Sequence, residues 1–80
     1  MRAEVSLNIL QPGEQAVILR IETTAHHLRQ RLLELGLTKG TRVEIVRTAP
    51  LGDPIEVMIK GYRLSLRKLE ASAVYVQKEN

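Results

Sequence analysis

Two spacings of apolar and polar residues run along the chain, and each predicts a different element. In residues 14–22, after the turn signal Pro12-Gly13, apolar residues alternate with a period of two, which is typical of a β-strand. The two faces of that strand would be Val17, Leu19 and Ile21, and Ala16, Ile18 and Arg20. Because both faces carry apolar residues, we expect both to be at least partly covered.

The next segment has the spacing of an amphipathic helix. Its apolar residues lie three or four positions apart, at Ala25, Leu28, Leu32 and Leu35. Thr23 and Thr24 precede them as candidate N-cap residues, and Gly36 stands where helices often end in a left-handed residue. Leu37 can then fold back on the last turn, so we predict one helix that stops in a Schellman cap.

Beyond the helix the period of two returns. Strands are predicted around Val43 and Ile45, around Ile55, Val57 and Ile59, around Tyr62, Leu64 and Leu66, and around Val74 and Val76. Residues 5–10 are expected to form a lead-in to the barrel, and residues 68–72 a short turn before the last strand. Residues 49–54 contain two prolines and predict a stiff connection between the first two of these strands. The glycines assigned to turn or cap positions are Gly13, Gly36, Gly40 and Gly61.

This order of elements indicates a mainly β fold in a single domain spanning residues 1–80. One strand, a helix and several closely spaced strands cannot build a parallel sheet, because parallel neighbours need long crossover connections. A small antiparallel β-barrel of about five strands fits, with one α-helix between the first and second main strands. We expect that helix to close one open end of the barrel with Leu28, Leu32 and Leu35.

The composition indicates the kind of core and the cellular compartment to expect. The chain has 80 residues, of which 44% are hydrophobic, and it has no Cys, Phe or Trp. The core must therefore be aliphatic, and the absence of cysteine is typical of a reducing compartment, so we expect a cytoplasmic protein. No stretch approaches the roughly 20 apolar residues that span a bilayer, so membrane association would come only through a partner.

Two neighbouring histidines, His26 and His27, raise the question of a metal site. Adjacent residues of a helix point about 100° apart, so the pair cannot readily chelate one ion, and no third ligand lies nearby in the sequence. No carboxylate pair or nucleophile motif indicates catalysis. We expect no cofactor, no metal site and no enzymatic activity.

A basic cluster raises the question of nucleic acid. The chain carries 12 Lys and Arg against 9 Asp and Glu, a net charge of +3, and Arg63 and Arg67 share one face of a predicted strand. In the folded sheet, Arg42, Arg47, Lys60 and Lys68 could join them in a basic patch. Recognition of single strands on small barrels combines such charge with aromatic stacking, and only Tyr62 and Tyr75 are available here. We expect an acidic protein partner or plain solvation, with no nucleic acid.

Protein contact is the remaining use of the surface, and two places are candidates. Leu33 falls about 140° round the helix from Leu28, outside the apolar stripe. Leu51 is held at a loop tip whose prolines reduce the entropy lost when a partner binds. The candidate contact residues are Leu33, Pro50, Leu51, Gly52, Asp53 and Pro54. The alternative for the loop is that it only closes the hairpin.

Three blocks of sequence resemble the FeoA family. They are residues 31–41 (RLLELGLTKGT), residues 49–55 (APLGDPI) and residues 61–67 (GYRLSLR) followed by Glu70-Ala71. The resemblance runs from Leu10-Gln11-Pro12-Gly13-Glu14 to Val76. Because these blocks contain turn, cap and core positions, the resemblance assigns no catalytic or metal-binding residue.

The resemblance implies an SH3-like barrel and a role in bacterial ferrous iron uptake. The implied partner is FeoB, a membrane GTPase permease, which a free-standing cytoplasmic FeoA protein would contact. Similar domains form the C-terminal part of iron-dependent repressors, so a metal-responsive regulatory domain is the alternative. A basic RNA-binding barrel is a third hypothesis, and steep salt dependence of binding would identify it.

Overall fold

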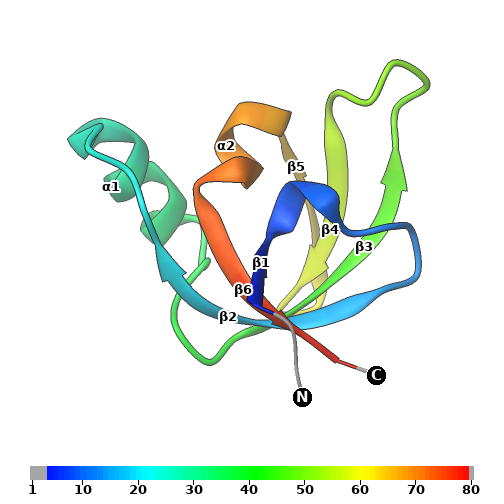
Figure 1. The fold of residues 1–80 in the computed structure, drawn as a ribbon, viewed down its shortest axis with the longest axis horizontal. Helices are drawn as coiled ribbons and strands as arrows, with labels where there is room; N and C mark the ends of the chain where they lie inside the picture. The colour runs from blue at the N-terminus through cyan, green and yellow to red at the C-terminus, as the bar shows by residue number, and fades with distance from the viewer. Residues whose placement is uncertain (1–3, 80) are drawn as a thin grey trace.

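The computed structural model describes residues 4–79, which form one antiparallel sheet with three short helical segments (Figure 1). The strands are β1 (Glu4–Ser6), β2 (Gln15–Ile21), β3 (Arg42–Thr48), β4 (Ile55–Ile59), β5 (Tyr62–Leu66) and β6 (Val74–Lys78). The helical segments are the 3-10 helix η1 (Leu7–Ile9), α1 (His26–Glu34) and α2 (Lys68–Ser72). The strand order is β1-β6-β2-β3-β4-β5.

The mainly β class and the place of the predicted helix are confirmed. Helix α1 connects β2 to β3, which are the first two long strands. The structure adds the short strand β1 and the helix α2, where the sequence indicated only a lead-in and a turn. Because β1 pairs with β6 and Glu4 faces Gln77, the outer ends of these strands lie side by side.

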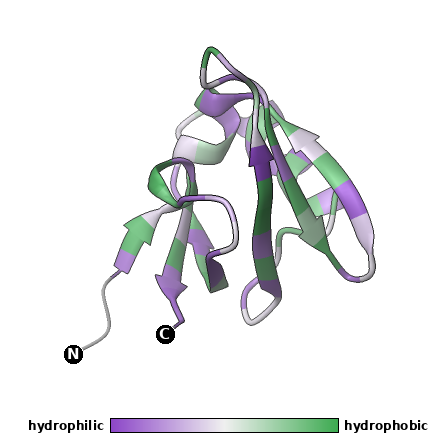
Figure 2. Cartoon of the chain, turned by 90° about the vertical axis from the view of Figure 1, so that its right-hand side faces the viewer, coloured by the Kyte–Doolittle hydropathy of each residue, from purple (hydrophilic) through white to green (hydrophobic). Residues whose placement is uncertain are grey.

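The core is aliphatic and continuous. Hydrophobic and hydrophilic residues alternate along the strands (Figure 2), and the apolar ones meet in one buried cluster. The side chains below 2% exposure with the largest volumes are Leu7, Ile18, Leu32, Leu37, Ile45, Ile59, Leu66, Val43, Val57, Val74 and Val76. Between residues 4 and 79 the structure buries no polar or charged side chain. Burial of branched side chains is therefore the main stabilising contribution.

The faces of β2 differ from the simple alternation that the sequence predicted. Ala16, Ile18 and Ile21 are buried, whereas Val17 and Leu19 are half-buried. The pairing with β6 shifts register between Ile18 and Arg20, which is a β-bulge. Because a bulge inserts one extra residue, it turns Ile21 to the core face.

Helix α1 begins one residue later than its threonines suggested. Its N-cap is Ala25, which has no side-chain cap, and the Thr23 hydroxyl instead accepts a hydrogen bond from the Ala25 N–H at 3.0 Å. At the other end the N–H of Gly36 donates to the carbonyl of Leu33 at 3.0 Å, and that of Leu37 to Leu32 at 3.1 Å. With Gly36 at φ +99°, these two bonds form a Schellman motif.

Helix α1 lies beside the barrel and does not cap its end. Leu32 is fully buried, while Leu28 and Leu35 are only partly buried against the core. The Arg29 guanidinium donates to the carbonyls of Ile21 and Thr23, which fixes the helix to the end of β2. The end of the barrel is covered by η1 and α2, which pack against each other. Within residues 4–79, no helix is long and apolar enough to cross a bilayer.

Candidate partner-binding surface

The loop between β3 and β4 projects Leu51 away from the molecule. The N–H of Ala49 donates to the carbonyl of Pro54 at 3.0 Å, and the N–H of Gly52 donates to the carbonyl of Ala49 at 2.7 Å. Gly52 has φ +89°, a conformation that glycine adopts without strain. These bonds close the base of the loop and leave the Leu51 side chain 97% exposed at its tip.

Asp53 has a structural partner inside the molecule. Its Oδ1 accepts a hydrogen bond from the backbone N–H of Lys68, the first residue of α2, at 2.9 Å. The N-cap residue of α2 is Arg67, whose guanidinium has no acceptor atom and cannot cap the helix. Asp53 therefore supplies the cap from a distant loop and fastens that loop to α2.

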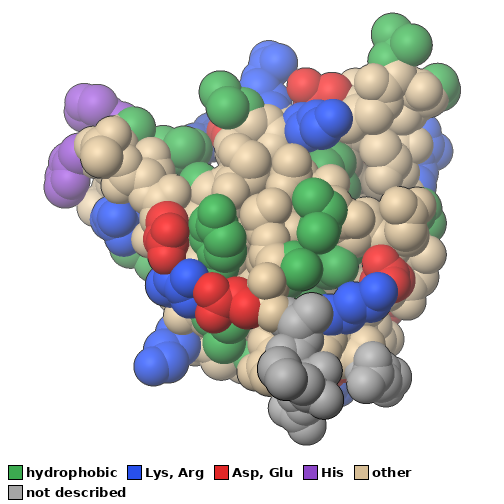
Figure 3. Space-filling view, viewed as in Figure 1, with side chains coloured by type: hydrophobic (Ala, Val, Ile, Leu, Met, Phe, Trp, Pro, Cys, Tyr) green, Lys and Arg blue, Asp and Glu red, His purple; other side chains and the backbone are tan. Residues whose placement is uncertain are grey.

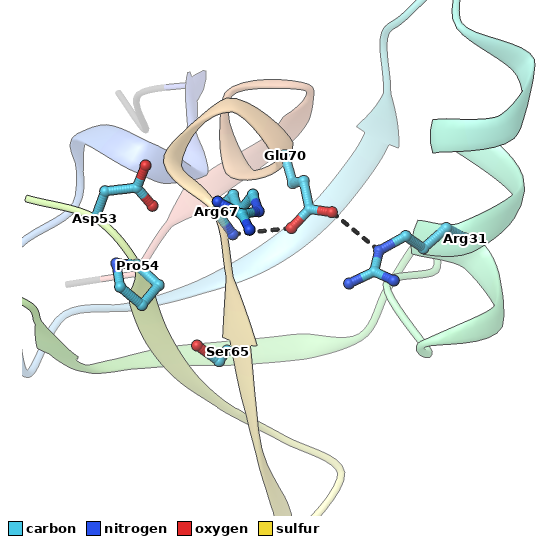
Figure 4. Close-up of a pocket in the computed structure, with 6 residues that line it drawn as sticks. All are labelled: Arg31, Asp53, Pro54, Ser65, Arg67 and Glu70. Atoms are coloured by element: carbon cyan, nitrogen blue, oxygen red, sulfur yellow. Dashed lines mark hydrogen bonds and ion pairs between the residues drawn. The ribbon is translucent and has the colours of Figure 1, made fainter.

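A shallow cleft of about 390 Å³ lies beside this contact (Figure 4). It is lined by Arg31, Asp53, Pro54, Ser65, Arg67 and Glu70. Glu70 accepts a hydrogen bond from the Arg67 N–H at 2.8 Å and a second from Arg31 Nε at 2.9 Å. The lining holds two arginines and two carboxylates, and each carboxylate already has a partner, so the cleft is a structural network between α1, α2 and the loop.

A second groove of about 400 Å³ also has Asp53 in its lining. It is lined by Asn8, Asp53, Lys68, Leu69 and Ser72. The Leu69 side chain is 77% exposed although it is large and apolar. The sequence did not indicate Leu69 as a contact residue because residues 68–72 were predicted to form a turn; the signal that could have found it is an unpaired leucine between polar neighbours.

The structure separates the two predicted contact places. Leu33 lies on α1 and is 42% exposed. Figure 1 shows α1 and the β3–β4 loop on opposite sides of the molecule. Loop residues 50–54 therefore form one surface and Leu33 belongs to another. The four glycines assigned to turns, Gly13, Gly36, Gly40 and Gly61, all have positive φ, between +83° and +99°.

Among the described residues, the histidines form no candidate metal site, and the basic residues divide between different acidic partners. His26 and His27 are both exposed, and their ring centroids lie 6.3 Å apart. Among residues 4–79, no group of three His, Asp or Glu side chains could hold a metal ion. Arg47 and Arg63 both pair with Glu56, at 3.5 and 3.6 Å, whereas Arg42 pairs with Glu79. The basic residues predicted to gather on one face are thus divided.

Charged side chains also bind the strands of the sheet together. The Arg20 guanidinium lies 5.1 Å from the centre of the Tyr75 ring and hydrogen-bonds to Glu4 and Glu22. The hydrogen bond from Arg20 lowers the pKa of Glu4, and the two carboxylates together raise the pKa of Arg20. Lys78 lowers the pKa of Glu14 in the same way. These pairs are exposed, so they contribute little to stability.

Comparison with known proteins gives one consistent family. The model of the FeoA domain matches residues 5–78. A relative from Porphyromonas gingivalis (strain ATCC BAA-308 / W83), an Fe(2+) transport protein A/Fe(2+) transporter FeoB fusion protein, is 39% identical over 71 residues. The match covers 89% of this chain but only 8% of that protein.

Solved structures agree with the sequence comparison. The FeoA-like protein from Clostridium acetobutylicum has a TM-score of 0.89 and 31% identity, covering 100% of this chain and 92% of that chain. The FeoA of Stenotrophomonas maltophilia complexed with zinc, described as a prokaryotic SH3 domain protein, has a TM-score of 0.77 and 32% identity, covering 95% and 88%. The predicted SH3-like fold is thereby confirmed.

The same fold occurs in a protein of another class. A manganese-dependent transcriptional repressor has a TM-score of 0.88 but only 18% identity, and the likeness covers 95% of this chain and 37% of that chain. At this level of identity the likeness is one of fold alone.

Proposed function

The chain belongs to the FeoA family, whose link is to ferrous iron transport, and from this premise we propose that it is an accessory protein of ferrous iron uptake that contacts a FeoB-like permease. In this proposal the chain acts on the cytoplasmic side and reaches the membrane only through the permease. It binds no nucleic acid and performs no catalysis of its own.

One observation carries the proposal. The Porphyromonas gingivalis relative joins a ferrous iron transport protein A and a transporter FeoB in a single polypeptide. Fusion holds two domains at a high effective concentration, which favours even a weak contact between them. A chain that is not linked to its permease would need a contact surface strong enough to replace the tether.

The exposed loop is the surface that we assign to this contact. Leu51 is the most exposed large apolar side chain of the described residues, and Pro50, Gly52, Asp53 and Pro54 frame it. Because Asp53 fastens the loop to α2, little conformational entropy would be lost on binding. Leu33 on α1 is a second, separate candidate for the contact.

The test is a binding measurement with the purified FeoB-like permease of the same organism. We expect Leu51→Asp to reduce binding by at least about tenfold while the thermal unfolding midpoint stays unchanged. Leu33→Asp measures the second candidate in the same assay. If the unmodified chain does not bind the permease, the proposed function is wrong; if it binds and Leu51→Asp binds equally well, the loop is not the contact.

A second candidate function is a metal-responsive regulatory domain. It is supported by the zinc complex of the Stenotrophomonas maltophilia FeoA. Calorimetric titration with ferrous and manganous ions separates the two functions. A regulator should bind one of these ions at about micromolar concentration or tighter, whereas an adaptor should bind neither.

A further inference from the structure

We propose that the groove lined by Asn8, Asp53, Lys68, Leu69 and Ser72, here called the end groove, binds a short segment of the partner protein that carries a large apolar side chain next to a carboxylate. This inference rests on the proposed function, because it specifies where and by what chemistry the chain would hold its partner. It extends the contact surface from the β3–β4 loop to α2 and η1, which the proposed function did not include.

The distribution of exposed apolar side chains singles out this groove. Among residues 4–79, the three most exposed large apolar side chains are Leu51 at 97%, Leu69 at 77% and Ile9 at 56%. They come from the three segments that surround the end groove: the β3–β4 loop, α2 and η1. Figure 3 shows hydrophobic side chains over these segments, with charged side chains between them. Of the three, Leu69 lines the end groove itself, and Leu51 and Ile9 lie on the two other segments that border it.

The polar groups of the groove favour an acidic partner. The Lys68 side chain is exposed, and its ammonium group has no carboxylate oxygen within 4 Å among the described residues. The Oδ1 of Asn8 accepts a hydrogen bond from the Ser6 hydroxyl, which leaves the amide NH₂ of Asn8 to donate outward. The Ser72 hydroxyl already donates to the Leu69 carbonyl at 2.6 Å. The groove therefore offers an ammonium group and an amide donor, and a carboxylate complements both.

The walls of the groove are held in place before any partner binds. Asp53 joins the loop to the first residue of α2, and α2 is joined to α1 through Glu70 and Arg31. Beneath the groove, Leu7 of η1 and Ala71 of α2 are fully buried in the core. A groove that is already formed loses little conformational entropy on binding. Less of the favourable free energy of its apolar contacts is therefore offset by that loss.

A protein segment fits this groove better than a lipid surface does. Attraction to anionic lipids typically requires a cluster of four to eight Lys and Arg residues. One lysine lines the end groove, together with the carboxylate of Asp53. A single cation beside the exposed Leu69 matches one acidic residue in an amphipathic segment.

Two substitutions with matched controls test the inference against the purified permease in nanodiscs. We expect Leu69→Asp to weaken binding by about thirtyfold, since loss of a central apolar anchor costs 2 kcal/mol or more. Leu69→Met keeps an apolar side chain and should retain binding. Lys68→Glu should weaken binding by about threefold to tenfold and reduce its salt dependence. Lys39→Glu, in the turn between α1 and β3, changes the charge equally and should have no such effect.

The outcomes separate this inference from the proposed function. If the unmodified chain binds and both Leu69→Asp and Lys68→Glu bind equally well, the end groove is not the contact, while the proposed function stands. If Lys39→Glu weakens binding as much as Lys68→Glu, the charge effect is not local, and the placement of the partner's carboxylate at Lys68 is wrong. If the chain binds vesicles containing 30% phosphatidylserine as tightly as the permease, and Leu69→Asp abolishes this, the occupant is a lipid surface and the inference is overturned.

Discussion

The carboxylate of Asp53 accepts a hydrogen bond from the backbone N–H of Lys68 at 2.9 Å, across 15 positions of sequence. Helix α2 has only five residues and begins at an arginine N-cap that cannot accept a hydrogen bond. The helix and the β3–β4 loop therefore stabilise each other, and this bond helps to hold the surface that they form together.

Removing the Asp53 carboxylate should destabilise the fold measurably. We expect Asp53→Ala to lower the free energy of unfolding by about 1 kcal/mol, as the loss of an N-cap does. In a domain of this size that corresponds to a midpoint lower by about 4–8 °C in a thermal melt. Asp53→Asn keeps a carbonyl acceptor and should lose less. Equal midpoints for all three proteins would show that the cap contributes nothing.

Two adjacent leucines of α1 should respond in opposite ways to truncation. Leu32 is fully buried and Leu33 is 42% exposed. We expect Leu32→Ala to cost about 2–5 kcal/mol of unfolding free energy, because it removes buried contacts and leaves a cavity. Leu33→Ala should change it by less than about 0.5 kcal/mol. Urea denaturation measures both, and a similar cost for the two would contradict the orientation of α1.

Substitution of Gly36 should be costly because of its backbone conformation. Its φ is +99°, and an added Cβ would meet its nearest neighbours, side-chain atoms of Lys60 and Tyr62, at an ordinary 3.6 Å. Space is therefore available, and the strain lies in the backbone. We expect Gly36→Ala to cost about 1–2 kcal/mol and Gly36→Asn to cost less, since asparagine tolerates this region better. Chemical denaturation that ranks asparagine below alanine would refute this explanation.

The pairing of Glu4 with Arg20 should be visible in a pH titration. Arg20 lowers the pKa of Glu4 from its usual 4.5. Since the folded-state pKa is the lower one, the pairing stabilises the fold above the usual value, and this contribution disappears as the pH falls through the folded-state pKa. NMR titration of the Glu4 carboxyl carbon should show a raised midpoint in Arg20→Met and an unchanged one in Arg42→Met. Identical midpoints in all three proteins would mean that the pair does not form in solution.

Much of the fold could be predicted from local pattern because its signals are local. The period of two located the long strands, and glycine after an apolar stripe located the end of α1. The bulge in β2 could not be predicted in this way, because strict alternation assigns Ile18 and Ile21 to opposite faces. Only the pairing with β6 shows that both side chains reach the core.

The candidate surface was harder to predict because its parts come from distant segments. The N-cap residue of α2, Arg67, has no acceptor in its side chain, and the residue that accepts from the Lys68 N–H lies in a loop 15 positions earlier. Without α2, residues 68–72 look like a turn and Leu69 looks incidental. The loop was predicted from its own prolines, whereas the groove beside it exists only after the barrel has closed.

The pairing of β1 with β6 has a consequence for how the domain can be attached to other proteins. Because Glu4 lies opposite Gln77, the start of β1 and the end of β6 lie together, away from α2 (Figure 1). A tether could therefore run from either terminus and leave the end groove facing outward. A partner domain could then precede or follow this domain in a fused polypeptide and still reach the end groove.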